Sequence, residues 1–221
     1  MRCIDRGDWP LDELGEQRQF NRYQEAVPYL KQRLGRYCSF CERWIATSLA
    51  VEHKQPKSKA SHLALTWSNF LLACSNCNSA KGTKAFGDAD VLWPDIDDTF
   101  GAFEYLPSGR IRPVKIESAD QQRRAGNLLG MVGMDRGPGE GISDHRWFDR
   151  LEVWRLAQQS LEDIADVATA QMAARIAETA ALRGGFSIWM RVFSQVPLVR
   201  DALTSRFPGT VLRHPEASRT L

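Results

Sequence analysis

The sequence predicts an α+β protein in which a small zinc-stapled core lies between an N-terminal helix and a mainly α-helical C-terminal region. Two observations predict this arrangement. Two Cys-x-x-Cys pairs enclose a stretch with few large aliphatic side chains, and beyond residue 144 apolar residues recur at three- and four-residue steps, which is the period of an amphipathic helix. We therefore expect an N-terminal segment with a helix over 1–35, a zinc core over 36–86, an acidic loop and hairpin over 87–118, and a helical region over 119–221.

The composition is that of an ordinary globular protein. The 221 residues suffice for one or two domains, 43% of them are hydrophobic, and the formal net charge is +2. No stretch approaches the about 20 apolar residues that a membrane-spanning helix needs, and no apolar signal-peptide core opens the chain. We therefore expect a cytoplasmic protein that does not enter a membrane.

Helices and one hairpin are expected outside the zinc core. A first helix is predicted over 16–34, where Pro28 either starts the second half or breaks it. A hairpin is predicted over 103–112, with a turn at Pro107-Ser108-Gly109. After the hairpin, the sequence indicates a helix over 119–134 and a flexible loop over 136–141. The apolar spacing then indicates a strongly helical segment over 144–182, which Gly184-Gly185 ends. Two further helices are expected over 187–196 and 197–206, the last of them ending before Phe207-Pro208-Gly209.

Four of the five cysteines form pairs with the spacing of zinc ligands: Cys38, Cys41, Cys74 and Cys77. Four thiolates suit a structural zinc ion, which is tetrahedral and closed when all its ligands are cysteine. Two disulfides, or a redox Cys-x-x-Cys motif, are the alternatives. The lack of a signal peptide argues against disulfides, and the lack of a strand–helix unit around either pair argues against a redox motif. Cys3 is expected to be a small apolar residue or an inert thiol rather than a ligand.

Further polar residues between and just after the cysteine pairs are not needed by that zinc. They are Glu52, His53, Asn69 and Asn78. Surplus ligands beside a closed zinc site suggest a second metal that takes part in chemistry. An imidazole with a pKa of about 6.5 suits a general base at neutral pH, and a divalent ion stabilises the charge that develops on a phosphate. This combination points to a metal-dependent nuclease.

The order of these residues resembles the HNH endonucleases. The motif runs Cys-x-x-Cys, Glu-His, Asn, Cys-x-x-Cys-Asn and Lys-Gly within residues 36–84. The resemblance implies a hairpin and a helix around one divalent metal, the ββα-metal core, with strands over 46–51 and 70–73 and a helix over 76–84. It also implies that His53 is the general base, that Glu52 and Asn78 bind the catalytic metal, and that Asn69 holds the hairpin so that His53 points correctly.

The expected metal ligands depart from the commoner pattern of that family, which has Asp before the base and often His at the last position. Glu52 and Asn78 offer oxygen atoms, which suit Mg²⁺ or Mn²⁺ more than Zn²⁺ or Ni²⁺. We therefore expect a structural zinc ion and a separate catalytic Mg²⁺ or Mn²⁺. The remaining histidines, which are His62, His145 and His214, lack such a context and are expected to be surface or structural residues.

Basic residues gather around the proposed site. Between residues 31 and 84 many lysines and arginines occur, but Glu42 and Glu52 are the only acids, and such a field suits a phosphate backbone. The expected nucleic-acid contacts are Lys54, Lys57, Lys59, Lys81 and Lys84. The alternative is that these are ordinary solvated surface lysines.

The sign of the local charge reverses over residues 85–104, which contain acids but no lysine or arginine. That segment is either a loop whose acids cap turns and helices, or a wall or docking surface for a basic partner.

The resemblance narrows to the HNH nuclease subunits of Septu anti-phage systems, which also occur with some retrons. It rests on the opening Met-Arg-Cys-Ile-Asp-Arg-Gly, on the blocks EHKQPKS and LTWSNFLLACSNCNSAKG, and on a late Phe-Pro-Gly. It implies DNA, or RNA, as substrate and an ABC/SMC-type ATPase subunit as partner, docked on 119–221. The chain has no GxxxxGK[ST] loop of its own. A free-standing restriction or mobile-element nuclease and a non-catalytic zinc module that binds nucleic acid or protein remain alternatives.

Overall fold

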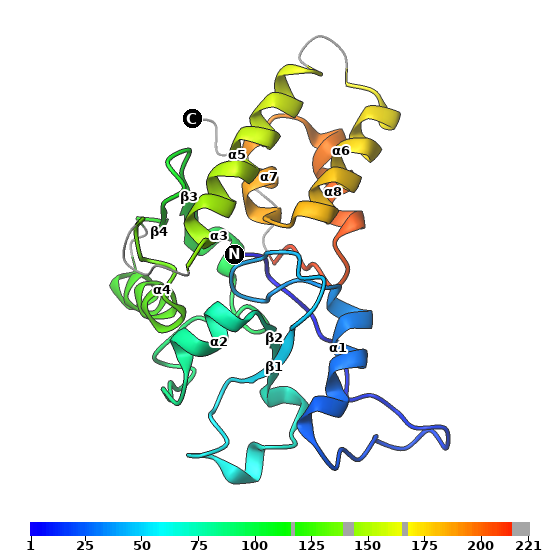
Figure 1. Ribbon diagram of the computed structural model, residues 1–221, viewed down its shortest axis with the longest axis vertical. Helices are drawn as coiled ribbons and strands as arrows, with labels where there is room; N and C mark the ends of the chain where they lie inside the picture. Colours follow the sequence, from blue (N-terminus) through cyan, green and yellow to red (C-terminus); the bar gives the residue numbers. More distant parts are fainter. Residues whose placement is uncertain (116–117, 139–143, 165–167, 214–221) are drawn as a thin grey trace.

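The computed structural model of this chain describes residues 1–115, 118–138, 144–164 and 168–213. The N-terminal half forms one end of an elongated molecule and the C-terminal helices form the other, with a second small hairpin beside them (Figure 1). Helices and two small two-stranded sheets make up the fold. The α+β class predicted from the sequence is therefore confirmed.

The first helix is shorter than the sequence predicted. A 3-10 turn over Tyr23–Ala26 leads directly into helix α1 over Val27–Leu34. Pro28 lies in the first turn of α1, where a missing N–H costs no hydrogen bond. The chain before it is irregular, because the Asp12 carboxylate accepts hydrogen bonds from the Leu14 and Glu16 amides and folds this stretch into a turn.

The zinc core has a hairpin followed by a short helix. Strand β1 covers Ala50–His53 and pairs antiparallel with β2 over Phe70–Ala73, and helix α2 covers Ser75–Lys81. The range of β2 is as predicted. The range of β1 is corrected, because Ser48 has a left-handed φ of 61° and the strand begins only after it, so that Glu52 and His53 lie inside the strand. Helix α2 ends at Lys81 because Gly82 follows with a φ of 53°, which glycine adopts without strain.

A second hairpin leads from the core to the helices. A single helical turn, α3, over Thr99–Ala102 precedes β3 over Phe103–Tyr105, which pairs antiparallel with β4 over Ile111–Pro113. Helix α4 then covers Ala119–Val132. These elements agree with the predicted hairpin and helix. The expected loop over 136–141 is described only to residue 138, and its remainder lies outside the described residues.

Several acids of the segment over 85–104 have partners within the chain. Asp98 caps α3 by accepting from the Gly101 amide at 3.0 Å, and Asp97 pairs with Arg124 at 2.9 Å. Asp95 is buried against Arg6 and Lys54. These contacts favour the interpretation of the segment as a structural loop.

The C-terminal region has two main helices where the sequence predicted one continuous helical segment over 144–182. Helix α5 covers Arg146–Glu162 and α6 covers Ala170–Arg183; residues 165–167 lie outside the described residues. A new helix begins at Ala170 because the Thr169 hydroxyl caps it by accepting from the Met172 amide at 3.2 Å. Helices α7 over Phe186–Val192 and α8 over Pro197–Arg206 complete the fold. Among the described residues, no helix combines the length and apolar character needed to cross a bilayer.

The C-terminal helices pack directly on the first cysteine pair. The Tyr37 hydroxyl donates to the Ala181 carbonyl at 2.8 Å, and the buried Glu42 carboxylate accepts from the Ser187 amide and hydroxyl at 2.8 and 2.7 Å. Gly184, at a φ of 77°, lies so close that a Cβ there would be 2.4 Å from the Glu42 carbonyl oxygen. The buried apolar side chains of both ends accordingly form one continuous core.

Candidate active site and metal centre

Four buried thiols gather where β2 and α2 meet the turn that follows α1. The Sγ atoms of Cys38, Cys41, Cys74 and Cys77 all lie within 4.8 Å of one another, and those of Cys41 and Cys74 are 3.6 Å apart. All the cysteines are free thiols. A tetrahedral all-thiolate set at this spacing is the donor set of structural zinc, so the cluster fits the predicted ion. Cys3 is buried outside the cluster, and this burial raises the pKa of its thiol.

Two arginines border the cluster and were not predicted from the sequence. Arg146, at the start of α5, donates to the Cys77 sulfur at 3.1 Å. Arg43 bridges Asp149 on α5 and Asn76 on α2, at 2.7 and 2.9 Å. Cations beside four thiolates offset the negative charge of such a centre. The only sequence signal was the position of Arg43 two residues after the first pair. Nothing in the sequence pointed to Arg146, which lies 69 residues beyond Cys77.

The Glu52–His53 pair lies at the end of β1. Both side chains are buried, with 4% and 7% of their surfaces exposed. The His53 Nε2 lies 2.9 Å from the Ala64 carbonyl oxygen, and because a carbonyl can only accept, Nε2 carries the proton and Nδ1 of the neutral ring is left as the basic atom. Burial is the main cause that lowers the pKa of His53. The lowered pKa favours the neutral imidazole, with Nδ1 free to accept a proton as a general base must.

Asn69 joins both ends of the loop that follows β1. Its Oδ1 accepts from the Gln55 amide at 2.7 Å, while its Nδ2 donates to the carbonyls of Gln55 and Leu63 at 3.0 and 3.1 Å. The next residue after Leu63 is Ala64, whose carbonyl contacts His53. Asn69 thus holds together the loop whose Ala64 carbonyl contacts His53.

Lys81 was expected to contact nucleic acid, but it is not at an exposed position. Its side chain is fully buried, and its Nζ lies 2.8 Å from the Glu52 Oε1 and 2.7 Å from the His53 carbonyl oxygen. Burial raises the pKa of Glu52, and the Lys81 ammonium opposes that rise. The lysine therefore ties α2 to the two consecutive residues of the proposed catalytic pair and helps to keep the carboxylate charged.

Replacing Lys81 with Met is expected to destabilise the fold by about 3–5 kcal/mol, because one partner of a buried ion pair is removed and the other is left unpaired. The matched control is Lys84→Met, since Lys84 is exposed three residues further along. Urea unfolding of both zinc-loaded variants measures the difference. Equal unfolding midpoints would show that the Glu52–Lys81 pair carries no net stability.

Asn78 lies one turn before Lys81 on α2 and is half-buried. Residues three apart on a helix share a face, and Lys81 on that face contacts Glu52 across from β1. Asn78 and Glu52 are thus placed on facing elements. Their donor atoms are carboxylate and amide oxygens, the set that Mg²⁺ or Mn²⁺ prefers, and they fit the predicted catalytic metal in chemical type.

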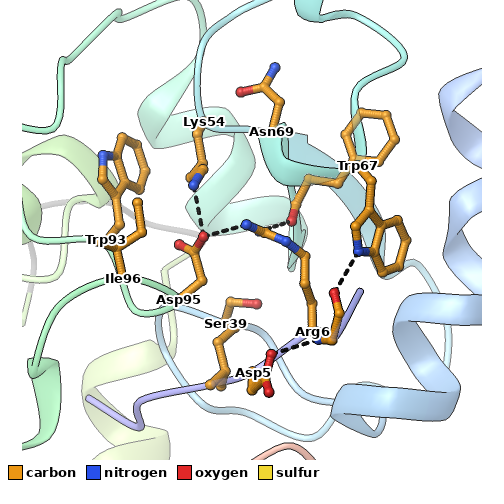
Figure 2. Close-up of polar contacts among 12 residues, drawn as sticks. Asp5, Arg6, Ser39, Lys54, Trp67, Asn69, Trp93, Asp95 and Ile96 are labelled. Carbon is orange, nitrogen blue, oxygen red and sulfur yellow. Dashed lines mark hydrogen bonds and ion pairs between the residues drawn. The ribbon is translucent and has the colours of Figure 1, made fainter. Parts of the chain in front are cut away.

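The other expected lysines fall into two groups. Lys54 is buried and its Nζ lies 2.7 Å from the Asp95 Oδ2, which also binds Arg6 at 2.6 Å (Figure 2). It therefore holds the acidic loop against the hairpin and is not exposed to a phosphate backbone. Lys57, Lys59 and Lys84 are exposed and have the accessibility that such a contact needs. Sequence patterns could not distinguish the groups, because the acid that pairs with Lys54 is 41 residues away.

The ring of His53 is enclosed by two aromatic residues that the sequence did not single out. Tyr23 lies edge-on to it with ring centroids 4.9 Å apart, and Phe70 does so at 5.3 Å. Phe70 was predicted only as part of a strand, and Tyr23 only as part of a helix.

Of the remaining histidines, His62 and His145 are exposed and His214 lies outside the described residues.

Comparison with known proteins gives matches for part of this chain. Residues 36–84 match the family model of the HNH endonuclease, so this segment carries an HNH domain. The chain is also similar to the Septu protein PtuB of Bacillus thuringiensis, with 31% identity over 77 residues. That match covers 32% of this chain and 30% of PtuB, so the chain matches less than a third of that relative's length.

Proposed function

We propose that this protein is a metal-dependent HNH endonuclease that hydrolyses phosphodiester bonds of DNA. The observation that carries the proposal is the placement of Glu52, His53 and Asn78 around the end of β1 and the facing side of α2, within a segment that matches the HNH family. A non-catalytic zinc module needs no imidazole held with its basic nitrogen free.

The roles follow from the contacts of each side chain. His53 takes the proton of the attacking water at Nδ1, since Nε2 is engaged by the Ala64 carbonyl. Asn69 keeps that carbonyl in place through the loop that it clamps. Glu52 and Asn78 hold Mg²⁺ or Mn²⁺, which when bound stabilises the charge on the phosphate and the leaving oxygen. Lys57, Lys59 and Lys84 are the exposed lysines for the phosphate backbone.

We further propose that the nuclease is the effector of an anti-phage complex with an ABC/SMC-type ATPase of the PtuA kind. The support is the similarity to a Septu protein together with a helical region over 119–221 that is larger than a small nuclease core needs. Of its aromatic residues, Phe186, Trp189 and Phe193 are fully buried, whereas Phe148 is 51% exposed and is the better candidate for a partner contact. Free thiols suit the reducing cytoplasm as the site of action.

The test is a cleavage assay of the purified chain on plasmid DNA, single-stranded DNA and RNA, alone and with an ABC/SMC-type ATPase of the PtuA kind. We expect cleavage of DNA that requires Mg²⁺ or Mn²⁺, that mild EDTA stops, and that the partner increases. EDTA should leave the zinc in place, which elemental analysis checks. Cleavage that is indifferent to chelation would show that Glu52 and Asn78 hold no catalytic metal, and full activity without a partner would favour a free-standing nuclease.

A further inference from the structure

One aromatic ring lies between the proposed general base and an exposed lysine. The centroid of the Tyr23 ring is 4.9 Å from that of His53, and the Lys57 ammonium lies 4.7 Å from the same Tyr23 centroid. Tyr23 belongs to the 3-10 turn before α1, His53 ends β1, and Lys57 lies four residues further along the chain. Two segments far apart in the sequence, the turn before α1 and the end of β1 with its following loop, thus meet at this ring.

The ring limits the freedom of a side chain that is otherwise mobile. An ammonium over an aromatic face is attracted to it within about 6 Å of the centroid. A free surface lysine loses rotamer entropy of about 1.5–2 kcal/mol when a ligand fixes it, and a lysine already placed by a ring loses less. Lys57 stays exposed and, within the described residues, forms no ion pair with a carboxylate, so its charge is available to an anion.

The other basic groups near His53 do not share this property. Lys54 is paired with Asp95, and Lys81 is buried against Glu52. Among the lysines that were expected to contact nucleic acid, Lys57 therefore combines exposure, a fixed position and proximity to the base. A cation that contacts the same ring as the base can bind the phosphate at one side of the bond that is cut.

We propose that Tyr23 positions Lys57 to bind a backbone phosphate next to the scissile bond, and that the same ring keeps the His53 imidazole in line with that phosphate. Lys57 is then a nucleic-acid-binding residue, and Tyr23 is a positioning residue that acts through it. This inference rests on the proposed nuclease function and adds to it the phosphate-binding partner of the base.

The first test measures binding of a DNA duplex to Lys57→Ala, without Mg²⁺ or Mn²⁺ so that no cleavage occurs. Loss of one phosphate contact reduces the slope of log K against log salt concentration by about 0.9. We expect that reduction for Lys57→Ala and a wild-type slope for Lys57→Arg. The matched control is Lys115→Ala, which removes the same charge from an exposed position after β4 and should leave the slope unchanged. A wild-type slope for Lys57→Ala overturns the proposal.

The second test addresses Tyr23. Tyr23→Phe keeps the ring and should bind like the wild type, whereas Tyr23→Leu should raise Kd about two- to fivefold, which corresponds to an exposed cation–π contact of about 0.5–1 kcal/mol. In a Lys57→Ala background Tyr23→Leu should have no further effect on Kd. Tyr23→Met, whose flexible side chain fills the same space, serves if Tyr23→Leu does not fold. A folded variant without the ring that binds as tightly as the wild type refutes the positioning role.

The outcomes also separate this inference from the proposed function. A wild-type protein that neither binds nor cuts nucleic acid contradicts both. A wild-type protein that cuts DNA, with Lys57 and Tyr23 variants that bind and cut normally, contradicts this inference alone.

Discussion

His53→Ala is expected to abolish nucleic-acid cleavage while the protein stays folded. Loss of a positioned general base typically lowers the rate by about 10²–10⁴, and no other imidazole among the described residues lies beside Glu52 to replace it. Metal and phosphate binding should persist, because the proposed metal ligands and the exposed lysines are untouched. The effect should therefore appear in kcat, with little change in KM.

The matched control for that variant is His62→Ala, which removes an exposed imidazole from the loop that follows β1. It should cleave at the wild-type rate. Zinc content and circular dichroism of both variants check that the fold is kept. Near wild-type turnover of the His53→Ala protein would refute the assignment of the base.

Local patterns predicted the parts of this fold that depend on neighbours in sequence. The four cysteines are grouped as their spacing indicated, β2 and α8 have the predicted ranges, and the HNH resemblance over 36–84 is confirmed. The apolar period could not reveal the break between α5 and α6, because both helices bury one face with the same period and the cap at Thr169 is a local hydrogen bond.

The charges around the site could not be sorted by sequence alone. Lys54, Lys57 and Lys81 look equivalent in a basic stretch, yet one binds a distant acid, one lies over an aromatic ring and one is buried beside Glu52. Which of these occurs depends on residues that the fold brings in from other segments. The roles of Glu52, Asn69 and Asn78 stay predictions, since their positions agree with those roles but their chemistry is untested.

The cysteine cluster links the two ends of the molecule. Residues beside the first pair hold the C-terminal helices, through the contacts of Tyr37 with Ala181 and of Glu42 with Ser187. A residue of α5 also contacts the cluster, since Arg146 donates to the Cys77 sulfur. Zinc at this place would therefore stabilise the nuclease core and the packing of the helices on it together.

Cys74→Ser is accordingly expected to unfold the whole chain. Structural zinc contributes about 10–16 kcal/mol of apparent binding free energy in small peptides, and a domain has only about 5–15 kcal/mol of net stability, so loss of one thiolate ligand is enough. Cys3→Ser is the matched control: Cys3 is equally buried, lies outside the cluster, and has polar partners in the Asp98 carboxylate and the Phe100 amide that a hydroxyl can keep. We expect one zinc per chain for the wild type and Cys3→Ser, and a protease-sensitive, zinc-poor protein for Cys74→Ser. If Cys74→Ser keeps its zinc and its Tm, the cluster is not the metal centre that holds this fold together.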